Sequence, residues 1–167
     1  MITGLRFGAG RAKVAHTKTK QIKGNAPMAD KTQLARQFIE AIPHARELGM
    51  VLTEIGDGMA EITMAYDEKL IGDPETGVIH GGAVSAVMDT CCGAAVMSHP
   101  SAPGGTATID LRIDYMRAAT PGQTIVTRAT CHHITRNVAF VRAVAMDDDS
   151  DRPVATASGA FTVEKGF

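Results

Sequence analysis

The chain reads IHGGAVSAVMDTCCGAAVMS over residues 79–98, and this stretch decides the fold. Its side chains are small or apolar with one exception, because Asp89 is the single charged residue between Gly77 and Ile109. A stretch that is apolar nearly all round is typical of a helix enclosed by a sheet. Its glycines, the central Asp89 and the prolines at positions 100 and 103 favour a buried helix over a membrane span.

The segments on either side of this helix have the alternating pattern of strands. A hairpin is predicted from residues 50–55 and 59–66 around the turn Gly56-Asp57-Gly58, and a polar loop follows at residues 67–77. After the long helix, four further strands are predicted, at residues 106–116, 124–133, 137–146 and 154–163. The predicted fold class is therefore α+β, with one long central helix wrapped by an antiparallel sheet.

Length and charge bound the domain count and the partners. The 167 residues, 44% apolar and 21% charged, fit one soluble globular domain. Residues 1–27 hold six of the 17 basic side chains and no acid, and we predict a disordered basic extension there. Asp30 can cap a helix running to about residue 42, so the folded domain is expected over residues 28–167. Its 11 bases face 18 acids, which disfavours nucleic-acid binding.

Two further expectations concern the N-terminus and the compartment. Met28 directly precedes the predicted helix, which raises the hypothesis that residues 1–27 are not part of the native protein. The N-terminus is basic but lacks the apolar segment of a signal peptide. The three cysteines are sparse and odd in number, which is typical of a reducing compartment. We therefore expect a cytoplasmic protein.

The long helix carries the residues that suggest chemistry. An ionised carboxylate is costly in an apolar helix unless it is paired, so Asp89 is a candidate base or nucleophile. The alternative is a buried carboxylate that is hydrogen-bonded to Ser85, one turn upstream. Gly81 and Gly82 leave backbone N–H groups at the positive end of the helix, where they can form an oxyanion hole. The alternative there is a glycine pair that only permits tight packing.

Spacing along the helix separates these two features. Gly81 and Asp89 are eight residues apart, which corresponds to ~12 Å at the rise of an α-helix. Both cannot contact one carbonyl group, so either they serve different sites or a second subunit supplies one of them. Two such helices packed antiparallel about Ser85 would bring each Gly81 near the partner's Asp89. This geometry predicts a two-fold homodimer with two shared active sites.

Three segments together resemble a known family. Residues 77–82 read GVIHGG, Asp89 follows nine residues after His80, and residues 108–116 read TIDLRIDYM. This pattern is similar to that of the hotdog-fold acyl-CoA thioesterases of the PaaI type. The resemblance implies a hotdog fold, a homodimer that is commonly paired into a homotetramer, and hydrolysis of acyl-CoA thioesters without metal or organic cofactor.

The resemblance also implies roles for individual residues. Asp89 would be the nucleophile or general base, the Gly81 amide would polarise the thioester carbonyl, and His80 would shape the turn before it. Thr108 matches a position near the attacking water. Contacts with the CoA portion are implied at Tyr115, Arg117, Arg136 and Asn137.

One position departs from the family pattern. The family often has an Asn six residues before the His, and this chain has Pro74 there, with Asp73 beside it. One extra loop residue would let Asp73 take that place. An Asp cannot donate a hydrogen bond as an amide does, which places the loop's contribution to catalysis in question.

Other signals are discarded or kept as alternatives. Cys131-His132-His133 is not expected to bind a metal, because neighbouring strand residues point to opposite faces. The acidic run at residues 147–151 is interpreted as a solvated turn. The leading hypothesis is hydrolysis of a small or medium acyl-CoA, aromatic acyl groups included. The alternatives are a non-catalytic hotdog module that senses acyl-CoA and, with weaker support from the motif spacing, a hotdog hydratase or dehydratase.

Overall fold

A computed structural model describes residues 37, 39–101 and 104–164. The predicted extension over residues 1–27 and most of the predicted helix from Asp30 lie outside these residues. The described elements follow the expected order, and their bounds are α2 (Pro43–Glu47), β1 (Met50–Gly56), β2 (Met59–Met64), η1 (Glu68–Leu70), β3 (Ile71–Asp73), β4 (Val78–Ile79), α3 (Gly81–Met97), β5 (Thr108–Tyr115), β6 (Ile125–Ile134), β7 (Val138–Met146) and β8 (Ala155–Thr162).

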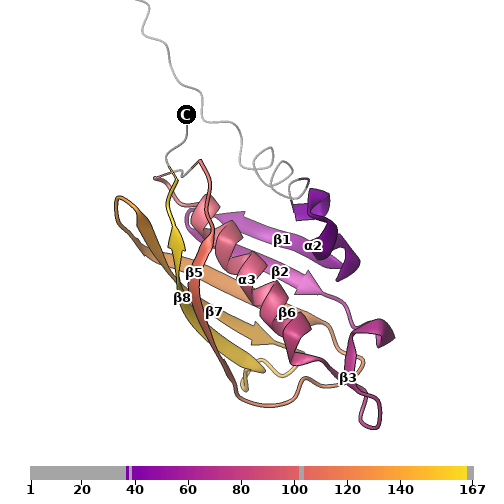
Figure 1. Ribbon diagram of the computed structural model, residues 1–167. Coiled ribbons are helices and arrows are strands. Elements are labelled where there is room, and N and C mark those ends of the chain that lie inside the picture. The colour runs from indigo at the N-terminus through magenta and orange to yellow at the C-terminus, as the bar shows by residue number, and fades with distance from the viewer. Residues whose placement is uncertain (1–36, 38, 102–103, 165–167) are drawn as a thin grey trace, which may run out of the picture.

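Six of the strands form one antiparallel sheet in the order β1-β2-β6-β7-β8-β5, with α3 lying across it (Figure 1). The hairpin β1–β2 turns at Gly58, whose positive φ of 81° suits glycine. Among the described strands β5 pairs with β8 alone, so its outer side forms an edge of this sheet. The α+β prediction, with one long helix against an antiparallel sheet, is confirmed.

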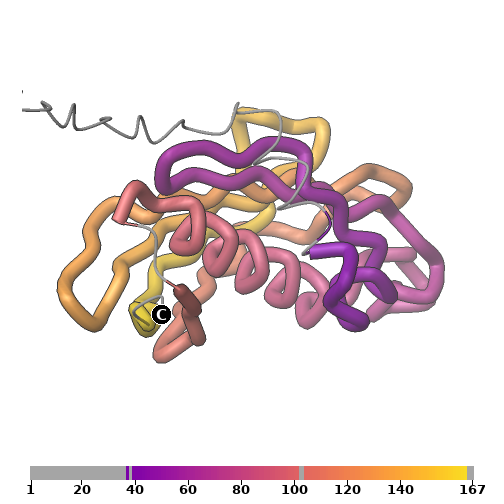
Figure 2. Tube along the Cα trace, turned by 90° about the horizontal axis from the view of Figure 1, so that it is seen from above, coloured from indigo at the N-terminus to yellow at the C-terminus, as the bar shows by residue number. Residues whose placement is uncertain are grey.

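The face of the sheet toward α3 holds the core. Along β6 the buried side chains alternate with exposed ones, and along β7 the buried positions include Ala139, Ala143 and Ala145. Such small side chains let α3 approach the sheet closely, so that Val87, Met88 and other apolar residues of the helix are fully buried. Figure 2 shows α3 as a layer alongside the curved strands.

The sheet does not enclose the helix completely, which corrects one expectation. Gly82 and Met97 are exposed, and Ser85, Asp89 and Gly93 between them are only partly buried. These five positions recur at helical spacing and form a stripe that the sheet leaves uncovered, which we call the uncovered stripe.

The segment before α3 is more ordered than the predicted polar loop. It contains the short helix η1 and a small hairpin, β3 and β4, with Ile71 opposite Ile79. A Cβ on Gly72 would lie 2.7 Å from the His80 Cα, so the two backbones are in close contact. The hairpin thereby fixes the residue from which α3 begins. No helix in the described residues is long and apolar enough to cross a membrane.

Candidate active site

Asp89 and Thr108 meet at the uncovered stripe. The Thr108 hydroxyl, from the start of β5, donates a hydrogen bond of 2.7 Å to Asp89 Oδ1. The alternative partner considered from the sequence, Ser85, bonds elsewhere. Within the described residues, Asp89 Oδ2 has no hydrogen-bond partner and Asp89 forms no ion pair. This oxygen is therefore available to a water molecule or a carbonyl carbon.

The first turn of α3 presents one free backbone donor. His80 is the N-cap, and its Nδ1 accepts the Gly82 N–H at 2.9 Å. The Ala83 N–H donates to the His80 carbonyl. The Gly82 amide is therefore occupied, whereas the Gly81 amide has no partner in the part of the chain that the structure describes. Gly81 is the glycine of the pair that can donate to an oxyanion.

Tyr115 and an apolar groove border Gly81. The Tyr115 hydroxyl donates to the Gly81 carbonyl at 2.7 Å and lies 2.6 Å from Ser85 Oγ. The groove has a volume of about 300 Å³ and is lined mainly by small and apolar side chains, namely Val78, Ile79, Val84, Met116, Ala118, Ala119 and Val154, together with Gly81, Tyr115 and Arg117. Six of the ten lie in the two quoted motif segments or, in the case of Arg117, were singled out from the sequence, whereas Val84, Ala118, Ala119 and Val154 belong to no motif.

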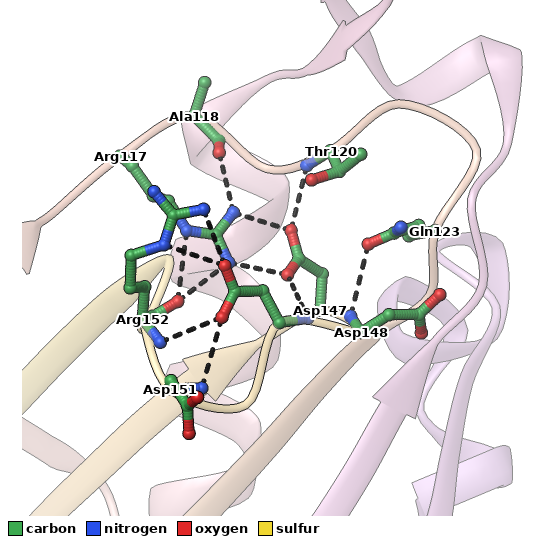
Figure 3. A network of polar contacts seen from close by, with 9 residues as sticks. Arg117, Ala118, Thr120, Gln123, Asp147, Asp148, Asp151 and Arg152 are labelled. Atoms are coloured by element: carbon green, nitrogen blue, oxygen red, sulfur yellow. Dashed lines mark hydrogen bonds and ion pairs between the residues drawn. The ribbon is translucent and has the colours of Figure 1, made fainter.

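Arg117 is engaged within the chain. Its guanidinium donates to both carboxylate oxygens of Asp147, at 2.6 and 2.7 Å, and to the carbonyls of Ala118 and Arg152 (Figure 3). These five bonds use all five of its N–H donors. The side chain fixes the loop after β5, and its N–H donors are all used within the described residues, so a contact of Arg117 with CoA stays a prediction.

Asp147 corrects a second interpretation, that of a solvated acidic turn. Its side chain is fully buried, and its carboxylate also accepts the Thr120 and Asp149 amides. The hydrogen bonds from Arg117 hold the pKa of Asp147 well below its usual range. No local pattern indicates this pair, because the two residues lie in different loops.

Asp73 is held by its own loop. Its two carboxylate oxygens accept the Glu75 N–H at 3.1 Å and the Thr76 hydroxyl at 2.6 Å. These hydrogen bonds, that from Thr76 first, lower the pKa of Asp73. A carboxylate of this kind cannot donate to a thioester oxygen, so Asp73 does not replace an amide in that function.

The two remaining candidates, Arg136 and Asn137, are exposed in the turn between β6 and β7. Strand pairing places this turn at the same end of the sheet as Thr108, because Ala139 lies opposite Phe161 and Phe161 opposite Thr108. Tyr115 lies at the other end of β5, seven residues and roughly 23 Å away. One chain therefore holds the candidate residues in two groups, at opposite ends of its edge strand.

The three cysteines are buried. Cys91 Sγ donates to the carbonyls of Ala60 and Thr127, and burial raises the pKa of its thiol to about 12. Burial also raises the pKa values of Cys92 and Cys131. Such thiols are poor nucleophiles. No cluster of His, Cys, Asp or Glu among the described residues is arranged to hold a metal ion.

Comparisons with known proteins identify the family and the fold. Residues 76–154 match the family model of the thioesterase superfamily. A crystal structure of a Pseudomonas aeruginosa protein is 37% identical and has a TM-score of 0.70, with 78% of this chain and 97% of that chain covered. For a thioesterase family protein from Silicibacter pomeroyi the identity is 25%, the TM-score 0.70 and the coverage 80% and 98%.

A third structure has the same fold at lower identity. The E. coli PaaI protein from the phenylacetic acid degradation operon is 20% identical, with a TM-score of 0.71 and coverage of 83% of this chain and 95% of that chain. A search among curated proteins finds no match. The architecture is thus the hotdog fold of the PaaI proteins. The chain belongs to the thioesterase superfamily.

Proposed function

We propose that the protein hydrolyses small or medium acyl-CoA thioesters, aromatic ones included, to the free acid and CoA. The observation that carries this proposal is the Asp89–Thr108 pair, because one carboxylate oxygen is held at 2.7 Å while the other is unpartnered within the described residues. Thr108 orients the carboxylate, and Oδ2 takes a proton from water as the water oxygen attacks the thioester carbon.

The Gly81 amide supplies the electrostatic part of the reaction. It donates to the oxygen that becomes negative in the tetrahedral intermediate. Collapse of this intermediate breaks the C–S bond, and the CoA thiolate leaves and takes up the proton. A direct attack by Oδ2 would instead give a mixed anhydride that water then hydrolyses. Oxygen-18 in Asp89 after a single turnover in labelled water would identify that second route.

We further propose that the site is shared between two subunits, as the spacing along α3 predicts. The edge strand supports this arrangement. Thr108 holds Asp89 at one end of β5, and Tyr115 contacts Gly81 at the other. Antiparallel pairing of β5 with its copy would place the Thr108 end of one chain beside the Tyr115 end of the next. The uncovered stripe of α3 would be covered by the same contact. Pairing of such dimers into a tetramer, and a cytoplasmic location, remain proposals from the sequence.

Asp89→Asn tests the catalytic assignment in a thiol-release assay on the full chain, with acetyl-, hexanoyl-, benzoyl- and phenylacetyl-CoA. We expect kcat to fall by about 100-fold or more, because a general base contributes at least that factor. Asp57→Asn is the matched control, since Asp57 is an exposed acid in the turn between β1 and β2, at the edge of the sheet opposite to β5. Wild-type turnover in the Asp89 variant would contradict the assignment.

The loop at Asp73 favours a second candidate, an acyl-CoA-binding module without catalysis. Its carboxylate cannot polarise a thioester, and the adjacent Pro74 has no N–H. Binding of phenylacetyl-CoA by calorimetry, without thiol release by the wild-type protein, would support this candidate over hydrolysis.

A further inference from the structure

Tyr115 contacts the first turn of α3 at two atoms. Its hydroxyl donates to the Gly81 carbonyl at 2.7 Å and lies within hydrogen-bond distance of Ser85 Oγ, at 2.6 Å. Gly81 opens the helix, and its carbonyl is also the regular acceptor for the amide four residues later. The Tyr115 bond is therefore additional to the helical pattern, and it joins the edge strand to the turn that carries the free amide.

Both ends of one peptide unit are held by side chains. The Gly81 carbonyl and the Gly82 N–H belong to the same planar unit, which rotates as one body. Tyr115 holds its oxygen, and His80 Nδ1 holds its N–H at 2.9 Å. Two successive glycines have the widest conformational freedom of any dipeptide. These contacts therefore restrict backbone dihedral angles that the glycines alone would leave free.

The Tyr115 ring has a separate contact with the same residue. A Cβ on Gly81 would lie 3.3–3.4 Å from three atoms of the Tyr115 side chain, so the ring packs against the glycine Cα. The ring is 50% exposed and forms part of the wall of the apolar groove. The hydroxyl and the ring can therefore be tested apart, because one holds the peptide and the other borders the groove.

We propose that Tyr115 is a positioning residue, whose hydroxyl holds the Gly81–Gly82 peptide and thereby restricts the backbone dihedrals of Gly81, so that the Gly81 amide, which lies in the adjacent His80–Gly81 unit, points at the thioester oxygen. The inference rests on the proposed hydrolysis and adds a residue to it. Loss of the hydroxyl leaves the groove wall intact and loosens the donor. The consequence falls on the transition state, where the donor is needed, and not on substrate binding.

Tyr115→Phe tests the proposal with the acyl-CoA panel. We expect kcat to fall about tenfold while KM stays within about twofold, since a misplaced donor weakens transition-state stabilisation alone. Tyr115→Leu removes the ring as well, and we expect KM to rise in addition. Ser85→Ala leaves the Gly81 contact in place and should lower kcat less than Tyr115→Phe does.

Tyr66→Phe is the matched control. Tyr66 is the other tyrosine of the chain, and its hydroxyl also donates to a glycine carbonyl, that of Gly77, at 2.8 Å. We expect this variant to keep wild-type kcat. An equal loss of kcat in both variants, or a Tyr115→Phe variant that keeps wild-type kcat or changes KM alone, would overturn the positioning role.

A readout without substrate separates this inference from the proposed function. In ¹H–¹⁵N spectra of the full chain, Tyr115→Phe should shift the Gly81 and Gly82 amide signals and speed hydrogen exchange at Gly82, whereas Tyr66→Phe should leave both unchanged. Unmoved signals in Tyr115→Phe would refute the hold on the peptide. If the wild-type protein releases no thiol, the proposed hydrolysis fails, and the amide signals still decide whether Tyr115 holds this turn.

Discussion

At the scale of a single residue, the Thr127 hydroxyl lowers the free energy of unfolding. Thr127 is fully buried on β6, and its Oγ1 has no hydrogen-bond partner in the described part of the chain. A hydroxyl that is buried without a partner loses the hydrogen bonds that it made with water in the unfolded chain, and this loss destabilises the folded state. The backbone carbonyl of the same residue is used, since it accepts from Cys91 Sγ.

Thr127→Val should therefore raise the free energy of unfolding by about 1 kcal/mol, because valine keeps the shape and removes the unpaired hydroxyl. Urea denaturation of the two proteins measures the difference. Thr130→Val, on the exposed side of the same strand, is the control and should stay within about 0.5 kcal/mol of wild type. A loss of stability in the Thr127 variant would mean that its hydroxyl is satisfied in solution.

At the scale of elements, one ion pair joins the loop after β5 to the turn between β7 and β8. The Asp147 side chain is fully buried and that of Arg117 is 20% exposed. Removal of one partner leaves the other charge buried without compensation. Because Arg117 and the loop that follows it line the apolar groove, the pair fixes part of the groove wall.

Asp147→Ala should lower the free energy of unfolding by about 3 kcal/mol at pH 7. Arg152→Ala, which breaks an ion pair whose Arg is 75% exposed, should cost less than about 1 kcal/mol. The pKa of Asp147 is lower in the folded than in the unfolded protein, where it is about 3.9. The stabilisation from the Asp147 carboxylate is therefore complete above about pH 5 and is lost as pH falls through the folded pKa. Below about pH 4, the stability of Asp147→Ala should depend less on pH than that of the wild-type protein. Equal acid sensitivity in both proteins would contradict this.

At the scale of the whole molecule, the separation of Gly81 from Asp89 predicts complementation between inactive subunits. Gly81→Pro removes the free amide at a position where the backbone of a helix start accepts proline, and the Tyr115 ring, 3.3 Å from the new Cβ, must shift slightly. Asp89→Asn removes the carboxylate. Each variant alone should be inactive. In a mixed dimer, the Gly81 of one chain and the Asp89 of the other form one intact site.

Equal mixing by co-refolding should then restore about a quarter of wild-type activity, because half of the dimers are mixed and each has one intact site of two. Native mass spectrometry confirms that mixed dimers form, and the recovered activity itself shows that both variants fold. Mixed dimers without activity would place the whole site within one chain and contradict the shared arrangement.

The sequence by itself determined the long helix and the order and approximate bounds of the main strands. It also identified Asp89 as an isolated carboxylate and therefore as a candidate functional residue. These follow from local patterns, namely apolar periodicity, turn glycines and one isolated charge, which a single segment carries in full. The His80-Gly81-Gly82 start of α3 is of the same kind, since an N-terminal cap is formed by neighbours in the chain.

Only the tertiary structure decided which side chains meet. Thr108 donates to Asp89 across 19 residues, and Tyr115 to Gly81 across 34, because β5 runs beside α3. Arg117 and Asp147 pair across 30 residues, a structural contact that no sequence pattern predicted. The register of the sheet fixes these contacts, and it depends on the packing of all six strands at once, so no local pattern contains it.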